Sequence, residues 1–294
     1  MFEQTNGQGE GWALMEANHK RRILGSLNGV FSVSSTALAP LSGRAKDCLR
    51  PGSLLHDVMA VRLAERLGCL DGPESMSAYW STIRTALLDR TVRQFLTQHP
   101  GATIVELGCG LNTRYERLDN GVARWIEVDL PAMVRLRETL VDRSPRREML
   151  ACSVLDRVWI KRSRELTQGE AVLVVAEGLL MYLDPSDVRE LIGRISGELQ
   201  ASALLFDYAD PNIALWQNRA FSSRGLEVRF RWQADRATDL ATDHLAHVLL
   251  DDSLVRLAKR ARLRLTARWR FWSAFAAVFR RRLLHGHRIA YLSR

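Results

Sequence analysis

Val105-Glu106-Leu107-Gly108-Cys109-Gly110 is the stretch that decides the fold of this chain. An apolar run over 102–107 breaks at two glycines one residue apart, and Thr113 follows as a residue that can open a helix. This pattern predicts a buried strand, a tight turn and a helix N-terminus. The turn lacks the third glycine of a dinucleotide fingerprint, and no phosphate loop follows it. Glycine lets a ligand approach the backbone closely, and open α/β sheets bind ligands where their strands end.

A second apolar run, over 123–129, ends in Asp129 and is followed by Pro131. Asp129 lies about 20 residues beyond the glycine turn, the spacing at which an acidic residue binds ribose hydroxyls in Rossmann-type sites. One carboxylate can accept hydrogen bonds from both hydroxyls. The alternative role for Asp129 is an N-cap of the helix that Pro131 opens. The two motifs together predict a site for a nucleoside-containing cofactor.

The length and composition of the chain indicate a globular protein. Its 294 residues, 47% of them hydrophobic, suit one large α/β domain with a cap or two small domains. No apolar run reaches the roughly 20 residues that span a bilayer, so we expect no stable membrane insertion. The first residues, MFEQTNGQGEGW, are polar and contain no hydrophobic signal region, and a cytoplasmic location is therefore expected.

The formal net charge is +9, and only four of the 42 basic residues are lysine. Such a charge favours anionic partners, including carboxylates, phosphates and membrane surfaces. The sequence carries no aromatic and basic RNA-binding pattern, so a nucleic-acid partner is not expected. The four cysteines have neither metal-ligand nor redox spacing, and no metal site is expected.

Apolar runs alternate with amphipathic segments from residue 101 onward, which predicts an α/β fold. We expect strands over 103–107, 124–129, 147–152, 171–176, 203–208, 244–250 and 287–292, and helices over 113–118, 132–141, 184–197 and 253–282. Upstream, apolar spacing predicts helices over 12–24, 54–67 and 79–96. The small residues over 26–39 predict a loop or the start of a lid.

Four segments carry a resemblance to a known family: VELGCGLNTRYERL (105–118), WIEVDLPAMVRLRETL (125–140), CSVLD (152–156) and VVAEGLLMYL (174–183). They resemble the leucine carboxyl methyltransferase superfamily, and most of all its tetracenomycin-type (TcmP-like) polyketide O-methyltransferase branch. The resemblance implies a class I methyltransferase fold, with a Rossmann-like seven-stranded sheet whose last strand is antiparallel. We accordingly divide the chain into a disordered start (1–11), a helical cap (12–100) and a core (101–294) with a substrate-binding insertion at about 209–240.

The resemblance implies S-adenosylmethionine as the cofactor and S-adenosylhomocysteine as its product. The residues that match the family's cofactor contacts are Arg44, Arg84, Glu106, Gly108, Gly110, Asn112, Arg114, Asp129, Leu130, Val154, Leu155, Asp156, Glu177 and Gly178. Position 112 departs from the family pattern, because much of the superfamily has aspartate where this chain has asparagine.

Three of these residues have specific implied roles. Arg84 would bind the cofactor carboxylate through two parallel hydrogen bonds, and its alternative is a surface ion pair with Asp89 or Asp57. Glu177 would accept a hydrogen bond from the cofactor ammonium. Asp156 would accept one from the exocyclic amine of adenine, and its alternative is a cap on the following helix.

The chemistry of methyl transfer narrows the choice of acceptor. Transfer from a sulfonium is an in-line displacement, and alignment of the reactants supplies much of the acceleration. A carboxylate acceptor is already ionised at neutral pH, whereas a phenol benefits from a general base. No His–acid base pair stands out in the sequence: His244 and His247 belong to a predicted strand, and His285 and His287 flank a glycine in a turn.

The charge, the lack of an evident base and the resemblance favour carboxyl O-methylation of a specialised metabolite or of a peptide C-terminus. Tyr182 would position the substrate, with a core tyrosine as its alternative, and Arg219 or Arg224 would hold the acceptor carboxylate. A phenolic or enolic hydroxyl is the alternative acceptor. The alternative of another class is a non-catalytic binding protein that kept the fold. A nucleic-acid methyltransferase is disfavoured, because Asp210-Pro211-Asn212 does not match the Asn/Asp-Pro-Pro-aromatic motif.

Overall fold

The computed structural model describes residues 31–71, 75–167, 169–223, 225–261 and 286–294. The strands are β1 (Thr103–Leu107), β2 (Arg124–Asp129), β3 (Arg147–Ala151), β4 (Val172–Ala176), β5 (Ala203–Ala209), β6 (His247–Ser253) and β7 (His287–Ser293). The helices are α2 (Phe31–Cys48), α3 (Val58–Arg66), α4 (Met76–Gln98), α5 (Arg114–Leu118), α6 (Pro131–Leu140), α7 (Val158–Thr167), α8 (Pro185–Gly197), α9 (Pro211–Ser222) and α10 (Leu254–Arg260). Two short 3-10 helices are η1 (Leu180–Tyr182) and η2 (Ala237–Leu240).

The strands form one sheet in the order β3-β2-β1-β4-β5-β7-β6. The first five strands of the chain pair in parallel, and β7 runs antiparallel to both of its neighbours, β5 and β6. The seven-stranded sheet with an antiparallel last strand confirms the fold class predicted from the sequence. β1, β4 and β5 are buried along their whole length, which explains why their sequences are almost continuously apolar.

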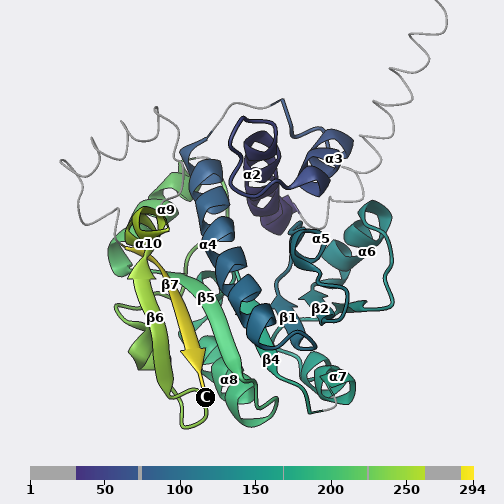
Figure 1. Ribbon diagram of the computed structural model, residues 1–294. Coiled ribbons are helices and arrows are strands. Elements are labelled where there is room, and N and C mark those ends of the chain that lie inside the picture. The colour runs from purple at the N-terminus through teal and green to yellow at the C-terminus, as the bar shows by residue number, and fades with distance from the viewer. Residues whose placement is uncertain (1–30, 72–74, 168, 224, 262–285) are drawn as a thin grey trace, which may run out of the picture.

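Helices cover both faces of the sheet (Figure 1). α7 and α8 pack against one face through residues such as Trp159 and Leu191, and α4 and α10 pack against the other through residues such as Ile83 and Leu254. α4 therefore belongs to the layer that covers the sheet. α2 and α3 lie beyond the ends of the parallel strands, at the top of Figure 1. The division into a cap over 12–100 and a core over 101–294 remains a prediction.

Two predicted elements begin later than the sequence suggested. The helix expected over 54–67 begins at Val58, because the carboxylate of Asp57 caps it by accepting a hydrogen bond from Ala60 N at 2.9 Å. The strand expected over 244–250 begins at His247, because Leu245 N donates to Thr242 Oγ1 at 3.1 Å and closes a turn before the strand.

The segment over 26–39, expected as a loop or lid, is helical from Phe31 onward as part of α2. The predictions for 1–24 lie outside the described residues, and of the helix predicted over 253–282 the structure describes only the start, in α10. Within the described ranges, no helix combines the length and the apolar character needed to cross a membrane.

Candidate active site

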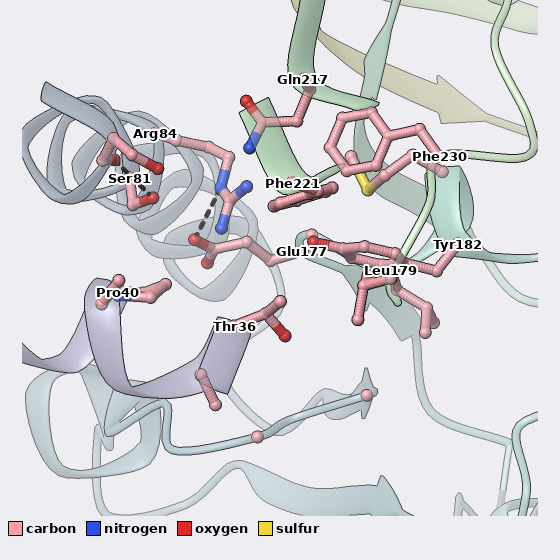
Figure 2. A pocket seen from close by; sticks show the side chains of 18 of the residues that line it. Thr36, Pro40, Ser81, Arg84, Glu177, Leu179, Tyr182, Gln217, Phe221 and Phe230 are labelled. Carbon is pink, nitrogen blue, oxygen red and sulfur yellow. Dashed lines mark hydrogen bonds and ion pairs between the residues drawn. The ribbon is translucent and has the colours of Figure 1, made fainter. Parts of the chain in front are cut away.

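A cavity of about 930 Å³ opens at the carboxyl ends of the parallel strands. Small-molecule sites typically measure about 300–1,000 Å³, so a cofactor and an acceptor can share this space. α2 contributes Thr36 and Pro40, α4 contributes Ser81 and Arg84, and α9 contributes Phe221 (Figure 2). The upstream helices and the 209–240 segment thus meet the strand ends at one cavity.

The glycine turn after β1 shapes one end of the cavity. Gly108 and Gly110 have φ values of +63° and +51°, which glycine adopts at little cost. Asp129 Oδ2 accepts a hydrogen bond from Gly110 N at 2.7 Å, and Oδ1 accepts one from Leu130 N at 2.7 Å. Because each carboxylate oxygen has a further lone pair, Asp129 can still accept from ligand hydroxyls. Leu130, not Asp129, is the N-cap of α6, so the capping alternative for Asp129 was wrong.

Burial affects the ionisation of Asp129. Burial raises the pKa of the Asp129 carboxyl, and the hydrogen bonds from Gly110 and Leu130 offset part of this effect. A hydrogen-bond acceptor whose charge is poorly solvated gains from any further donor that reaches it. Two ribose hydroxyls would be such donors.

The segment after β3 reaches the cavity only in part. Ser153 and Val154 line the cavity, whereas Leu155 and Asp156 are not among the lining residues. The exposed Asp156 carboxylate accepts a hydrogen bond from Ser153 N at 2.9 Å and so closes its own loop. Val154 and Leu130 offer apolar surface to a ligand, and the predicted bond from Asp156 to adenine stays a prediction.

Arg84 links two buried carboxylates at the cavity wall. Its Nε donates to Glu177 Oε1 at 3.0 Å, and its Nη1 donates to Asp207 Oδ2 at 3.2 Å (Figure 2 shows the first). The partners that the sequence suggested as alternatives, Asp89 and Asp57, bind other arginines. The two bonds use two of the five guanidinium N–H groups, so Arg84 keeps donors for a ligand carboxylate.

Glu177 is the hub of this charged cluster. Its Oε1 accepts from Arg84 and from Thr85 Oγ1 at 2.7 Å, and its Oε2 accepts from Asn112 Nδ2 at 3.2 Å and from Arg114 Nη2. Burial opposes ionisation, but the charges of Arg84 and Arg114 outweigh it and hold the pKa of Glu177 well below its ordinary range. All four acceptor positions are engaged, so a ligand ammonium would have to share one of them.

Glu106 and Arg114 lie behind the cavity wall and are not among its lining residues. Arg114 is fully buried and donates to Asp89 Oδ1 at 2.7 Å, to Glu106 and to Glu177. In this position the two residues fix Glu177 from behind. Direct contact of either residue with a cofactor stays a prediction.

Arg44 ties α2 to the segment that follows the glycine turn. It is 3% exposed and lines the cavity, and it donates to Asp57 Oδ2 at 3.1 Å and to Leu111 O at 2.6 Å. Asp57 also accepts from Thr113 Oγ1 at 2.6 Å and from Arg117 Nη1 at 2.7 Å. Burial lowers the pKa of Arg44, although the charge of Asp57 opposes this effect. Arg44 thus joins a structural network as well as the cavity.

Aromatic side chains form the side of the cavity opposite α4 (Figure 2). The aromatic residues that line the cavity are Tyr182, Trp216, Phe221 and Phe230, and Trp80, which belongs to α4 itself. The rings of Tyr182 and Phe230 pack edge to face with centroids 5.1 Å apart, and those of Phe221 and Phe230 do so at 5.7 Å. The Tyr182 hydroxyl bonds to Thr36, and burial raises the pKa of Tyr182 to about 12, so it stays protonated at neutral pH.

Of the two arginines expected to hold an acceptor carboxylate, the structure describes only Arg219. Arg219 is exposed on α9 and does not line the cavity, and Arg224 lies outside the described residues. Arg229 and Arg231 line it instead, and Arg231 donates to Asp184 Oδ2 at 3.2 Å. The exposed position of Arg219 on α9 gives no support to a role in holding the acceptor carboxylate.

The expectation that the sequence lacks a His–acid pair was wrong. His287 is the first residue of β7, where the strand predicted over 287–292 begins, and its Nε2 lies 2.7 Å from Asp207 Oδ2. Asp207 stands 80 residues earlier, and the antiparallel pairing of β5 with β7 brings it beside His287. A lone acid at the end of the apolar run ALLFDYA was the one available signal for Asp207. Gln217, which points toward Arg84 across the cavity, had no such signal (Figure 2).

Comparison with known proteins places this geometry in context. The model of the family described as leucine carboxyl methyltransferase matches residues 37–196. The tetracenomycin polyketide synthesis O-methyltransferase TcmP of Streptomyces glaucescens is 32% identical over 214 residues, which cover 71% of this chain and 78% of that protein. The S-adenosyl-L-methionine-dependent methyltransferase dpfgK of Gibberella zeae is 30% identical over 231 residues, 70% of this chain and 77% of that protein. Among solved structures, geranyl diphosphate C-methyltransferase from Streptomyces coelicolor A3(2) is 17% identical, with a TM-score of 0.42 over 76% of this chain and 86% of that one.

Proposed function

Because the chain belongs to the leucine carboxyl methyltransferase family, and is thus an S-adenosylmethionine-dependent methyltransferase, we propose that it methylates an oxygen atom of a small molecule of specialised metabolism. The observation that carries this proposal is the junction of the glycine turn, Asp129 and the Arg84–Glu177 pair at one cavity. These groups match the three polar parts of the cofactor, which are a ribose, a carboxylate and an ammonium.

The residues present fit S-adenosylmethionine. Gly108 and Gly110 keep the turn open to a ligand, and a Cβ atom at Gly108 would lie 2.9 Å from Leu179 Cδ1. Asp129 keeps lone pairs for the ribose hydroxyls, and Arg84 keeps donors for the carboxylate. We assign the apolar surface of Leu130 to the adenine ring.

The bound cofactor supplies a methyl group already activated by its attachment to a sulfonium. The task of the chain is to hold the acceptor oxygen in line with that group and to exclude water. The aromatic side of the cavity suits this task, because rigid rings such as Tyr182 and Phe230 orient a flat acceptor with little loss of conformational freedom. The hydroxyl of Tyr182 has a proton as well as lone pairs, so it can accept a hydrogen bond from Thr36 and still donate one to a ligand.

Two kinds of acceptor oxygen are candidates. A carboxylate of a metabolite or of a peptide C-terminus is supported by the family and by the cationic side chains of Arg229 and Arg231 at the cavity. A phenolic or enolic hydroxyl is supported by the His287–Asp207 pair, which supplies the base that a neutral acceptor needs. The lack of an evident base therefore no longer favours the carboxylate.

Calorimetric titration with S-adenosylhomocysteine tests the proposal. We expect micromolar binding to the purified chain, followed by transfer of a labelled methyl group to aromatic acids or phenols. Treatment of the product with alkali then separates the two acceptors, because a methyl ester saponifies and an aryl methyl ether does not. A folded chain that binds no cofactor, with or without candidate acceptors present, would instead favour the non-catalytic binding protein.

A further inference from the structure

β5 and β7 bring an aspartate and a histidine to the same edge of the sheet as the cofactor motifs. β7 is antiparallel to β5, so its first residue, His287, pairs with Ala209 at the end of β5. Asp207 precedes Ala209 by two residues on β5 and therefore lies on the same face of that strand, beside His287. His287 lines the cavity and is 25% exposed, whereas Asp207 is fully buried. A ligand in the cavity can therefore reach the imidazole but not the carboxylate.

The hydrogen bonds around Asp207 determine which nitrogen of His287 carries the proton. Asp207 accepts from Arg84 Nη1 at 3.2 Å and from Gly178 N at 2.5 Å. Burial opposes its ionisation, but the charge of Arg84 and the bond to His287 keep the pKa of Asp207 below its ordinary value. An ionised carboxylate can only accept, so His287 Nε2 must be the donor in their 2.7 Å contact. When the ring is neutral, its lone pair is therefore on Nδ1.

Nδ1 of His287 has no hydrogen-bond partner within the described part of the chain. The titratable or charged groups around this corner include Arg84 on α4, Glu177 after β4, Tyr182 on η1 and Asp210, the N-cap of α9, whose carboxylate packs against Gly286. α10 contributes the apolar side chain of Leu254 to the lining. An imidazole at the cavity, backed by a carboxylate, is the arrangement that general-base catalysis uses.

The pair is also close to the cofactor motifs. Gly178, whose N donates to Asp207, directly follows Glu177, the hub of the charged cluster. His287 is thus two hydrogen bonds away from the turn after β4. The aromatic rings of the cavity border the same space, so a flat acceptor can contact both the rings and the imidazole.

We propose that His287, held by Asp207, removes the proton from a phenolic or enolic hydroxyl of an aromatic acceptor, and that this hydroxyl is the methylated oxygen. The hydroxyl proton passes to His287 Nδ1. The oxygen forms a bond to the methyl carbon while the methyl–sulfur bond breaks. The electron pair of the broken bond stays on sulfur. The imidazolium, stabilised by Asp207, releases its proton to water after the product leaves. This inference rests on the proposed function and narrows its acceptor class.

The test uses 7-hydroxycoumarin, a phenol that titrates near neutral pH and whose phenolate absorbs at longer wavelength, with the full chain loaded with S-adenosylhomocysteine. We expect wild-type protein to ionise the bound phenol at lower pH than in free solution. His287→Gln should abolish this shift, because the glutamine Nε2 can still donate to Asp207 but has no basic nitrogen. His247→Gln is the matched control, because His247 is exposed on β6 and does not line the cavity.

Activity with labelled S-adenosylmethionine gives the second measurement. We expect His287→Gln to lower methylation of 7-hydroxycoumarin by about 10²- to 10⁴-fold, the usual size of a general-base contribution. Its affinity for S-adenosylhomocysteine should change less than about twofold, since no cofactor group is assigned to His287.

Three results would overturn the inference. One is a wild-type chain that binds S-adenosylhomocysteine but neither ionises nor methylates 7-hydroxycoumarin. Another is a His287→Gln variant that behaves as wild type, and the third is methylation of coumarin-3-carboxylic acid in its place. A wild-type chain that fails to bind S-adenosylhomocysteine would refute the proposed function itself, and the two failures are therefore distinguishable.

Discussion

Replacing Asp129 by asparagine should weaken cofactor binding through its ribose. In the structure, each Asp129 oxygen accepts one backbone hydrogen bond, from Gly110 or Leu130, and each can accept one more from a ribose hydroxyl. Asparagine has a single oxygen, so its amide NH₂ would face one backbone N–H and one hydroxyl would lose its acceptor. A lost charge-assisted hydrogen bond with an unpaired partner amounts to about 1–3 kcal/mol. We therefore expect affinity for S-adenosylhomocysteine to fall roughly 5- to 150-fold.

The assay compares ligands that differ only in the ribose. Calorimetry with adenosine should show the loss in Asp129→Asn, whereas 2′,3′-dideoxyadenosine should bind both proteins with equal affinity. Asp243→Asn is the control, because Asp243 is exposed and does not line the cavity. Equal weakening of both ligands would refute the ribose role and show that the substitution disturbs the glycine turn instead.

Further substitutions test the rest of the site. Arg84→Met should weaken S-adenosylhomocysteine by at least tenfold but leave 5′-methylthioadenosine, which lacks the amino-acid part, almost unchanged; calorimetry showing equal loss for both would contradict carboxylate binding. The pKa of Glu177 is lowered by folding, so its stabilisation exists above the ordinary glutamate pKa and is lost as pH falls below it. Urea unfolding of Glu177→Gln should thus show a shallower acid limb than wild type, by up to about 1.4 kcal/mol per pH unit, and an unchanged limb would remove Glu177 from the linkage. Gly108→Ala should destabilise the fold by at least about 1–2 kcal/mol, because φ is +63° and the new Cβ meets Leu179. Gly193→Ala, in open space on α8, should instead stabilise the fold by up to about 1 kcal/mol. Thermal unfolding distinguishes the two signs.

Local sequence pattern was sufficient for the sheet and for one end of the site. The apolar runs of β1 and β4 have to be buried on both faces, and the glycines after β1 have to adopt positive φ values, whatever the rest of the chain does. Asp129 is the last residue of β2, so the position of its carboxylate relative to the turn was predictable from parallel pairing alone.

Only the tertiary structure could assign the partners of the buried charges. Arg84 bonds to Glu177 and Asp207, which lie 93 and 123 residues away, and nothing in the helical pattern around Arg84 distinguishes them from Asp89 on the next turn. Charge attraction does not depend on sequence order, so pairing follows from which strand ends converge on the helix.

The His287–Asp207 pair shows the same limit. The sequence by itself determined that His287 begins an apolar strand, and it determined the strand's length to within one residue. The pattern of the strand itself carried no direction: only the resemblance to the family implied an antiparallel last strand, and the structure shows that this strand pairs with β5 and so places His287 at the carboxyl edge and not at the opposite one. The direction of one strand is a property of the whole sheet, because it depends on the edge of the sheet at which the chain enters that strand. In this protein the direction of β7 decides whether His287 reaches the cavity.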